Sequence, residues 1–368
     1  MKIALDVSGG DHAPQANVAG AVAAARELGV SVVLLGDEAA TRTELARHNT
    51  TGLEIEVVHA PELIEMTDHA AQAVRRKTQS PVVMGLRMVR DGTAAAFVSA
   101  GHSGATMAGA VLIVGRVRGI ERPCLATLFP SMTGRLVVAD VGATTDCKPE
   151  YLLQFAQMTS LYAERVLGVP TPRVALLANG EEATKGDKLV QEAHALLQTS
   201  GLNFVGNAEP KDAIVGTGVD VLIADGFVGN LFLKQGEAVA KFAAVKAKNA
   251  LLPGLALRVA VGLVPALLLT LLGQDRRRVA LAGLLGGPAL VAAVVAPLAK
   301  LRAVLDYRAF GGVPLLGVNG VVVIAHGKSD ALAVTNAMRR AKESVERGLV
   351  AAIQDVAQQA TAHEETRS

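Results

Sequence analysis

Short runs of apolar residues recur along the chain, each followed by a loop containing glycine or aspartate and then by a helical pattern. The first run, Ile3–Leu5, leads to Gly9–His12 and to a helical pattern around Val18–Leu28. The later runs are Ala95–Val98, Leu136–Ala139, Val174–Leu177, Val219–Ala224 and Val321–Ala325. Continuous apolar strands that alternate with helices are typical of a largely parallel sheet covered on both faces. The sequence therefore predicts an α/β fold whose strand-end loops line a ligand crevice.

One long segment breaks this alternation. Leu251–Leu272 is nearly all apolar, with Arg258 as its only charge, and Val279–Ala299 is uncharged throughout. The polar stretch Gln274–Arg278 separates the two arms. We interpret residues 246–302 as an apolar helical hairpin inserted into a single α/β domain that spans residues 1–368. Such an apolar surface favours docking on a membrane, pairing with a second subunit, or both.

The amino-acid composition and net charge argue against a nucleic-acid partner. Of the 368 residues 51% are hydrophobic but only 3% aromatic, so aliphatic side chains and alanine must build the core. The formal net charge is +2, and we find neither the basic stripe nor the stacking aromatics of a nucleic-acid-binding protein.

Cys124 and Cys147 form no CxxC pair, and no cluster has zinc-ligand spacing, so we expect reduced thiols and no metal. Met1–Asp6 reads as a strand without the apolar core of a signal peptide, which favours a cytoplasmic protein.

The loops after the apolar runs are the candidate binding site. Glycine lets backbone amides approach an anion closely, and each loop opens a helix whose N-terminus favours negative charge. Several such loops at one sheet edge predict a site for phosphate or for more than one anion, although each glycine could instead serve only a tight turn. The candidate binding residues are Gly9, Gly10, Asp11, His12, Gly101, His102, Ser103, Gly104, Gly142, Asp146, Gly226, Asn230 and His326.

The same loops offer poor nucleophiles. Ser103 lies in Gly-His-Ser-Gly, which differs from the Gly-x-Ser-x-Gly elbow of hydrolases. Ser99 ends an apolar run, where a capping or turn role is expected, and neither cysteine lies in an activating motif. A reaction in which the substrate itself is the nucleophile would explain this pattern. Inorganic phosphate is such a nucleophile.

Two charged residues in these loops are candidates for catalysis. Lys185 follows Gly180–Glu182 at a predicted helix start, where a cation opposes the helix dipole, so a bound anion would account for it. Asp225 directly follows an apolar strand, a position from which carboxylates often face the crevice. The alternatives are a solvated surface lysine and an aspartate that serves a turn.

At this level of detail the sequence resembles a known family, the bacterial phosphate acyltransferases (acyl-ACP:phosphate acyltransferases, the PlsX family). The resemblance runs from Asp6 to about Glu346. It is carried by the motifs Gly9–Pro14, Ala73–Lys77, Ser99–Ala105, Asp140–Ala143, Asp146–Glu150, Gly180–Glu182 with Lys185–Gly186, Asp225–Asn230, Pro314–Gly320 and Ala325–Gly327.

The resemblance implies a homodimeric, three-layer α/β/α fold related to the isocitrate dehydrogenase and phosphotransacetylase folds. It implies transfer of a fatty acyl group from acyl carrier protein (ACP) to inorganic phosphate, without a cofactor. It also implies a cytoplasmic enzyme that docks peripherally on the membrane, here through the Leu251–Ala299 hairpin, and feeds acyl-phosphate to a glycerol-3-phosphate acyltransferase for phospholipid synthesis. By resemblance, Lys185 and Asp225 are the residues expected to matter most.

The chain departs from the family pattern at several loop positions. The family loop usually reads Ser-Ala-Gly-Asn-Thr-Gly, and here His102 and Ser103 replace the asparagine and the threonine. Near the start, Ala-Met-Gly-Gly becomes Val7-Ser8-Gly9-Gly10. Thr144 stands where asparagine is common. Because these loop positions keep polar side chains, the anion-site interpretation holds while the individual donors change.

Three other functions compete with this one. A phosphotransacetylase-like enzyme would use acyl-CoA in place of acyl-ACP. A dehydrogenase would need a nicotinamide site, and we find no Gly-x-Gly-x-x-Gly with a later acidic residue. A membrane-anchored scaffold would bind acyl-ACP without phosphate-dependent turnover.

An acidic carrier protein needs a local basic surface, since the total charge is close to zero. Arg75–Lys77, at the end of a predicted helix, is the first choice, although these cations could simply complement the helix dipole. Arg339 and Arg340 are the second choice.

Overall fold

The computed structural model describes residues 1–132, 134–216, 218–246, 249 and 311–365. The chain divides into one compact unit made of Met1–Leu233 and Tyr307–Ser368 and a second made of Lys234–Asp306. The predicted hairpin, residues 246–302, falls almost entirely outside the described residues, so it stays a prediction. Among the helices that are described, none is both long and apolar enough to cross a membrane.

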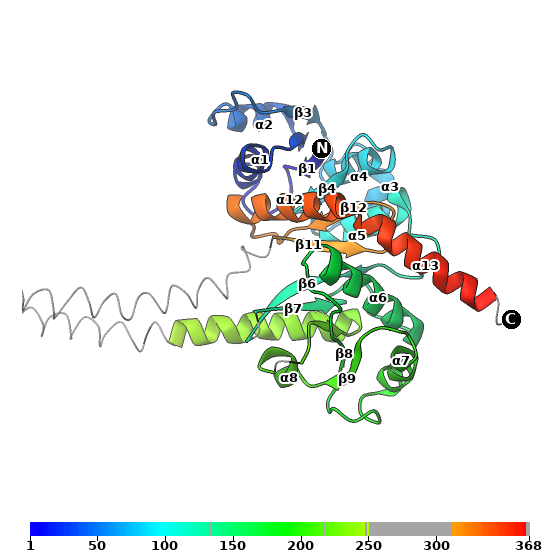
Figure 1. Cartoon of the computed structure of the whole chain (residues 1–368). Coiled ribbons are helices and arrows are strands. Elements are labelled where there is room, and N and C mark those ends of the chain that lie inside the picture. Colours follow the sequence, from blue (N-terminus) through cyan, green and yellow to red (C-terminus); the bar gives the residue numbers. More distant parts are fainter. Residues whose placement is uncertain (133, 217, 247–248, 250–310, 366–368) are drawn as a thin grey trace, which may run out of the picture. The chain divides into compact units, whose positions relative to one another are not determined.

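A seven-stranded sheet forms the first half of the larger unit (Figure 1), with the strand order β3-β2-β1-β4-β12-β11-β5. The strands from β3 to β12 run parallel, whereas β11 is antiparallel to both of its neighbours. After β1 the chain runs outward to β2 and β3 and then returns to β4 on the other side of β1. Ligands bind at such a switch point in open α/β sheets. The bounds are β1 (Lys2–Asp6), β2 (Ser31–Gly36), β3 (Ile55–His59), β4 (Ala96–Ser99), β5 (Cys124–Leu125), β11 (Val313–Leu316) and β12 (Val321–Ile324).

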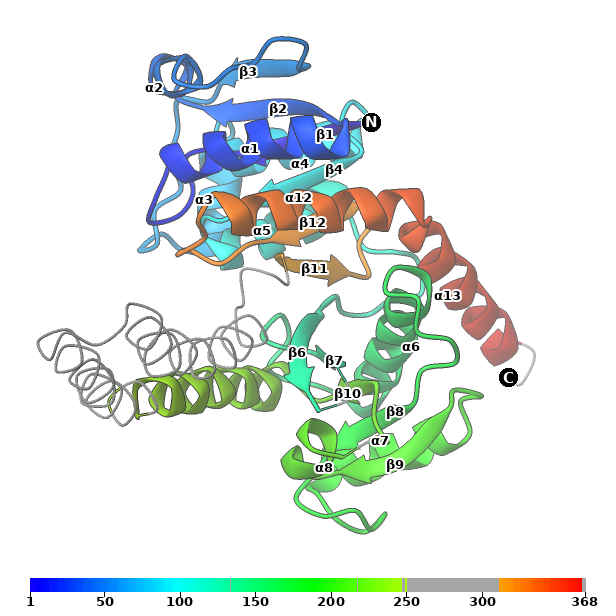
Figure 2. The ribbon, with the colours of Figure 1, turned by 60° about the vertical axis from the view of Figure 1, so that its left-hand side comes forward.

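Helices cover both faces of this sheet because successive strand residues point to opposite sides. Ile3 and Leu5 of β1 belong to the core beneath α1 (Gln15–Leu28) and α12 (Ala331–Glu346), which lie side by side in Figure 2. Ala4, between them, belongs to the core on the other face. The helices that contribute to that core or lie beside it are α3 (Ala70–Arg76), α4 (Pro81–Arg90), α5 (Ser103–Gly109) and the π-helix η1 (Ala110–Val114). A short helix, α2 (Glu38–Leu45), precedes β3.

A five-stranded sheet forms the second half, in the order β6-β7-β10-β8-β9. Only β6 is antiparallel to its neighbour. The bounds are β6 (Thr127–Ser131), β7 (Gly134–Ala139), β8 (Val174–Leu177), β9 (Phe204–Ala208) and β10 (Val221–Ile223). Val137, Leu176 and Ile223 share one core with side chains from α6 (Pro149–Arg165), α7 (Lys188–Gln198) and α13 (Leu349–Glu365). On this sheet's other face, α8 (Pro210–Ile214) contributes Ala213 to the core.

The six predicted strands are all present, but they belong to two sheets rather than to the one that the sequence predicted. The chain passes from the first sheet to the second through β5, which has only two residues and pairs with β11. The Ala126 amide then bonds to Pro314 O (3.3 Å), and β6 begins at Thr127. So short a strand shows no periodicity in the sequence, which is why the division was missed.

Candidate active site

The last residues of β1 and β4 hold two loops together at the switch point. The buried Asp6 carboxylate accepts hydrogen bonds from the Ser99 hydroxyl (2.8 Å) and from the amides of Ser8 (3.0 Å) and Gly9 (3.1 Å). Ser99 Oγ in turn accepts from the Gly101 amide (3.1 Å). Burial raises the pKa of Asp6, and these hydrogen bonds oppose the shift. One strand-end carboxylate therefore orders both loops.

The two loops approach so closely that only glycine fits. A Cβ atom on Gly9 would lie 2.5 Å from the Gly101 nitrogen, well inside van der Waals contact. The loop after β12 joins them, because the Asp11 amide donates to Gly327 O (2.7 Å). The structure thus brings the predicted residues of three loops to one sheet edge, and Asp11, His12 and His326 are exposed there.

A second buried carboxylate orders the loop after β7. Asp140 Oδ1 accepts from the amides of Leu125 (2.8 Å), Gly142 (3.2 Å) and Ala143 (3.1 Å), and its Oδ2 accepts from those of Ala143 (3.0 Å) and Thr144 (2.6 Å). Burial raises the pKa of Asp140 to about 6, against the effect of the amide donors. The Asp140–Thr144 turn is folded around this side chain.

The loop after β10 interlocks with that turn. The Gly226 amide donates to Thr144 O (2.8 Å), and a Cβ on Gly226 would lie 2.7 Å from Asp140 Oδ2. The Asn230 side chain faces Gly142: a Cβ atom built on Gly142 would lie 3.5 Å from Asn230 Nδ2. Asp225 Oδ1 accepts from the amides of the second and third residues after it (2.9 and 3.0 Å) and so caps the helix that begins at residue 226. Gly142, Asp225, Gly226 and Asn230 are therefore neighbours.

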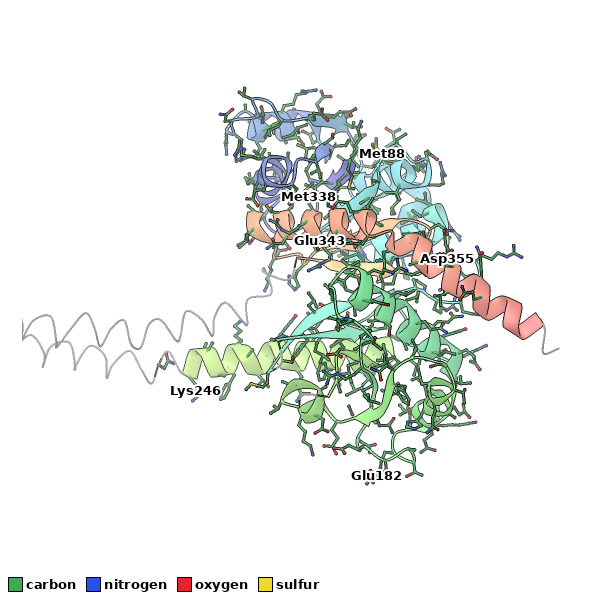
Figure 3. All side chains as sticks on the ribbon, in the orientation of Figure 1. Met88, Glu182, Lys246, Met338, Glu343 and Asp355 are labelled. Carbon is green, nitrogen blue, oxygen red and sulfur yellow. The ribbon has the colours of Figure 1, made fainter. Side chains whose placement is uncertain are left out.

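The strand order places the loop that carries Lys185 after β8, which pairs with β10 on the side away from β7. In register, Ile223 of β10 pairs with Ala139 of β7 and with Leu176 of β8, and parallel neighbours lie about 4.8 Å apart. In the loop after β8, Asn179 Oδ1 accepts from the Gly186 amide (2.9 Å). Its outer part is marked by the exposed Glu182 in Figure 3.

The Lys185 stem packs over the backbone of its own loop. A Cβ on Gly180 would come within 2.7 Å of Lys185 Cγ, so glycine is what allows this path. The Lys185 side chain is exposed, and within the described ranges no carboxylate forms an ion pair with it. It is available to an anion.

The predicted use of loop amides needs correction. The amides of Ser8, Gly9 and Gly101 donate to Asp6 or Ser99, those of Gly142, Ala143 and Thr144 donate to Asp140, and that of Gly226 donates to Thr144 O. Acceptors within the protein therefore occupy several of the donors that were expected to bind an anion. Gly9 and Gly226 are needed for close packing of the loops, and side chains such as Lys185 are further candidates for holding an anion.

His102, Ser103 and Gly104 open α5. His102 is its N-cap, accepting from the Ala105 amide at Nδ1 (3.2 Å), and its Nε2 lies 3.1 Å from Asp68 O. Both ring nitrogens are thereby bound within the protein. We therefore assign His102 a structural place beside the site rather than contact with the substrate.

The two thiols are poorly suited to act as nucleophiles. Cys124 is buried, which raises its pKa well above the usual range. Burial and the nearby carboxylates of Asp140, Asp225 and Asp146 raise the pKa of Cys147 to about 12, so its thiol stays protonated. Among the residues with described side chains, no group of histidine, cysteine and carboxylate side chains could hold a metal ion.

Sequence reasoning missed the residues that organise the loops. Asp6 ends β1 and Asp140 directly follows β7, each just before a glycine-containing turn, and that shared position is the signal that could have found them. It also missed Asn17, whose buried side-chain amide donates to Val7 O (3.0 Å) and Gly9 O (2.7 Å).

Ser329, beside His326, has a buried hydroxyl without a hydrogen-bond partner, which a bound group could satisfy.

Comparisons with known proteins agree on one family. The model of the family "Fatty acid synthesis protein" matches residues 1–258 and 260–352. The chain is 58% identical over 355 residues to a phosphate acyltransferase from Herpetosiphon aurantiacus, covering 96% of each chain. It is 45% identical to the phosphate acyltransferase from Pelotomaculum thermopropionicum, covering 95% of this chain and 93% of the other.

Solved structures agree on the fold. A phosphotransacetylase from Staphylococcus aureus superposes with a TM-score of 0.54 at 15% identity, covering 94% of each chain. A branched-chain phosphotransacylase from Enterococcus faecalis gives a TM-score of 0.53 at 13% identity, covering 93% of this chain and 99% of the other. This likeness shows the predicted relation to the phosphotransacetylase fold. By sequence, the chain belongs to the fatty acid synthesis protein family and is homologous to phosphate acyltransferases.

Proposed function

We propose that this protein transfers a fatty acyl group from acyl carrier protein to inorganic phosphate and so makes acyl-phosphate for phospholipid synthesis. The homology to phosphate acyltransferases over almost the whole chain carries the proposal. The site supports it, because Lys185 and Asp225 lie in the loops that follow the neighbouring strands β8 and β10, and burial raises the pKa of both thiols. An acyl transfer without an enzyme nucleophile fits direct attack by phosphate.

In the proposed reaction, a phosphate oxygen forms a bond to the thioester carbonyl carbon. The carbon–sulfur bond then breaks, and the carrier leaves as a thiolate that takes up a proton. Lys185 would hold a phosphate oxygen or stabilise the oxyanion that develops on the carbonyl. Asp225 would orient phosphate or accept its proton. Fixed charge and restricted motion of the two partners lower the barrier.

The direct test is an assay of purified protein with acyl-ACP and phosphate, in which acyl-phosphate and free carrier thiol are both measured. Equal formation of the two products supports the proposal. Turnover with acyl-CoA but not with acyl-ACP would make the protein a phosphotransacetylase-like enzyme. Binding of acyl-ACP without phosphate-dependent turnover would indicate a scaffold.

The carrier is expected to dock at Arg75 and Arg76. Of the five cations predicted for docking, Lys77 is paired with Asp68, Arg339 with Glu27 and Arg340 with Glu343. Arg75 and Arg76 are exposed in the last turn of α3. The first residue of that helix, Ala70, lies against Gly104 in the first turn of α5. A seven-residue helix such as α3 is only about 10 Å long. The two arginines therefore stand close to the site edge.

Reversing both charges (Arg75→Glu with Arg76→Glu) is expected to raise KM for acyl-ACP about tenfold at low salt, with kcat little changed, because rim charges mainly steer association. The defect should shrink as salt screens the interaction. A matched control is Arg165→Glu with Arg347→Glu, two exposed arginines at the ends of α6 and α12, which run back to the opposite sheet edges. An unchanged KM at low ionic strength would remove Arg75 and Arg76 from the docking surface.

We further propose that Leu251–Ala299 docks the protein on the membrane as a peripheral, homodimeric enzyme that passes acyl-phosphate to a glycerol-3-phosphate acyltransferase. Each arm has about the 20 residues that span a bilayer. Full insertion would carry Arg276, Arg277 and Arg278 through hydrocarbon at about 3 kcal/mol each. Shallow insertion instead leaves these arginines at anionic headgroups.

Liposome flotation tests this membrane contact. Wild type should float with anionic vesicles, and replacing Leu268, Leu269 and Leu271 by glutamate should abolish flotation. The control is Leu332→Glu, since Leu332 is an exposed leucine of the larger unit. Flotation that survives the triple change, or that wild type never shows, would contradict the proposal. Resistance to carbonate extraction would indicate a spanning hairpin.

A further inference from the structure

Lys77 lies in a basic motif, but its ammonium is bound by neighbouring groups of its own chain. Its Nζ donates to Asp68 Oδ2 (2.6 Å) and to Leu63 O (2.8 Å). Asp68 Oδ2 also accepts from the Glu65 amide (2.7 Å), and the ammonium lowers the pKa of Asp68. Lys77 thus closes the segment between Leu63 and Asp68 into a fixed loop. A side chain with these contacts is poorly placed to meet a partner protein.

The same loop supports the α5 end of the site. Asp68 O, a pure acceptor, lies 3.1 Å from His102 Nε2, so that nitrogen carries the proton. His102 Nδ1 is then free to accept from the Ala105 amide (3.2 Å) and cap the helix. The backbone contact therefore selects the one neutral tautomer that can serve as the N-cap.

The loop between β4 and α5 is consequently held at both ends. Ser99 ties its first end to the buried Asp6 carboxylate. His102 ties its second end to Asp68, and a Cβ on Gly104 would stand 3.4 Å from Ala70 of α3. Between these two anchors lies Gly101, which packs on Gly9 at the switch point.

We propose that Lys77, Asp68 and His102 form a positioning brace that fixes the Gly101–Gly104 loop for catalysis, and that Lys77 acts through the other two rather than by binding the carrier. This inference rests on the proposed acyl transfer. Misplacing a catalytic loop lowers the rate of the bound complex, because aligned reacting groups contribute much of the catalysis. Removing the brace therefore affects kcat, whereas removing a docking charge affects KM.

The test uses Lys77→Met, which keeps the aliphatic stem and removes the charge. We expect kcat with acyl-ACP and phosphate to fall about tenfold while KM for acyl-ACP stays within about twofold. Arg75→Glu with Arg76→Glu, in the same motif, serves as the contrasting pair with the opposite pattern. A rise in KM with unchanged kcat for Lys77→Met would overturn the brace and return Lys77 to the docking surface.

A double-mutant cycle tests whether Lys77 acts through His102. Asparagine at position 102 can still cap α5 but is too short to reach Asp68 O. His102→Asn therefore removes the contact between residue 102 and Asp68 and keeps the helix cap. Each single variant is expected to lose about tenfold in kcat, and the double variant no more than that, because members of one network are not additive. An additive loss of about 100-fold would mean that the two residues act separately.

Hydrogen exchange separates failure of the brace from failure of the proposed reaction. In Lys77→Met the Ala105 amide should exchange faster than in wild type, whatever the enzyme turns over. Asp68→Asn, which weakens the ion pair from its other side, should give the same acceleration and guards against a folding defect peculiar to one variant. Unchanged exchange at Ala105 in both variants would refute the brace, whereas faster exchange in a protein without acyl-ACP turnover would refute only the proposed function.

Discussion

Asp225→Asn is expected to lower kcat about 100-fold and to leave the protein folded. Asp225 Oδ1 caps the helix that begins at residue 226, and asparagine retains that acceptor. What asparagine loses is the negative charge and the ability to take a proton. Removing one preorganised charged group typically costs about 100-fold or more in rate. Steady-state kinetics with acyl-ACP and phosphate measure the effect.

Lys185→Met is the companion change on the other side of the site. Methionine keeps the apolar stem that packs over Gly180 and removes the ammonium. We expect a similar loss of about 100-fold in kcat, with a raised KM for phosphate if Lys185 holds a phosphate oxygen. Lys188→Met is the matched control, because Lys188 lies three residues further on, with a side chain 88% exposed that pairs with Glu192 of the same helix.

These variants distinguish catalysis from structure. If Asp225→Asn works at nearly the wild-type rate while Asp225→Ala is slow, Asp225 serves the helix cap alone. Near-normal rates for both Lys185→Met and Asp225→Asn would remove the pair from the mechanism. Urea unfolding of each variant shows whether a slow enzyme is also an unstable one.

The sequence predicted the strands that carry the site because their apolar runs are continuous and their loops are rich in glycine. It also named Asp225, which follows β10, and Lys185, in the loop after the neighbouring β8, as catalytic candidates, and these roles stay predictions. It could not predict that the loops divide between two sheets, since that depends on β5, a two-residue strand whose pairing with β11 joins positions almost 200 residues apart. Long-range pairing of so short a segment leaves no local pattern.

The sequence also misjudged what the glycines do. Gly9, Gly142 and Gly226 were expected to bring free amides to an anion, but their amides bind Asp6, Asp140 and Thr144. A strand-end aspartate before a glycine turn competes for the same donors as a phosphate would, and sequence spacing does not reveal which acceptor wins. Tautomer-dependent contacts such as that of His102 likewise depend on a residue, Asp68, that lies 34 positions away.

Loss of the Asp140 carboxylate should destabilise the folded protein strongly. Asp140→Ala leaves the amides of four residues without their acceptor. The bonds from Leu125 and Thr144 are buried, where a lost acceptor costs about 1–3 kcal/mol each, and those from Gly142 and Ala143 are partly buried and cost less. Removing a buried charge offsets part of this cost. We expect the free energy of unfolding at pH 7.5 to fall by about 3 kcal/mol or more by these magnitudes. Asp140→Asn keeps one acceptor oxygen and should lose less.

The pH dependence of this loss tests the cause of the Asp140 pKa. Its pKa is raised from 3.8 to about 6 in the folded protein, so between these values the native state binds more protons than the unfolded chain. Asp140 therefore contributes most below pH 4, and its contribution falls as pH rises to 6. The stability gap between wild type and Asp140→Ala, measured by urea unfolding, should be wider at pH 4.5 than at pH 7.5. A gap that widens as pH rises would mean that the four amide donors outweigh burial and lower the pKa instead.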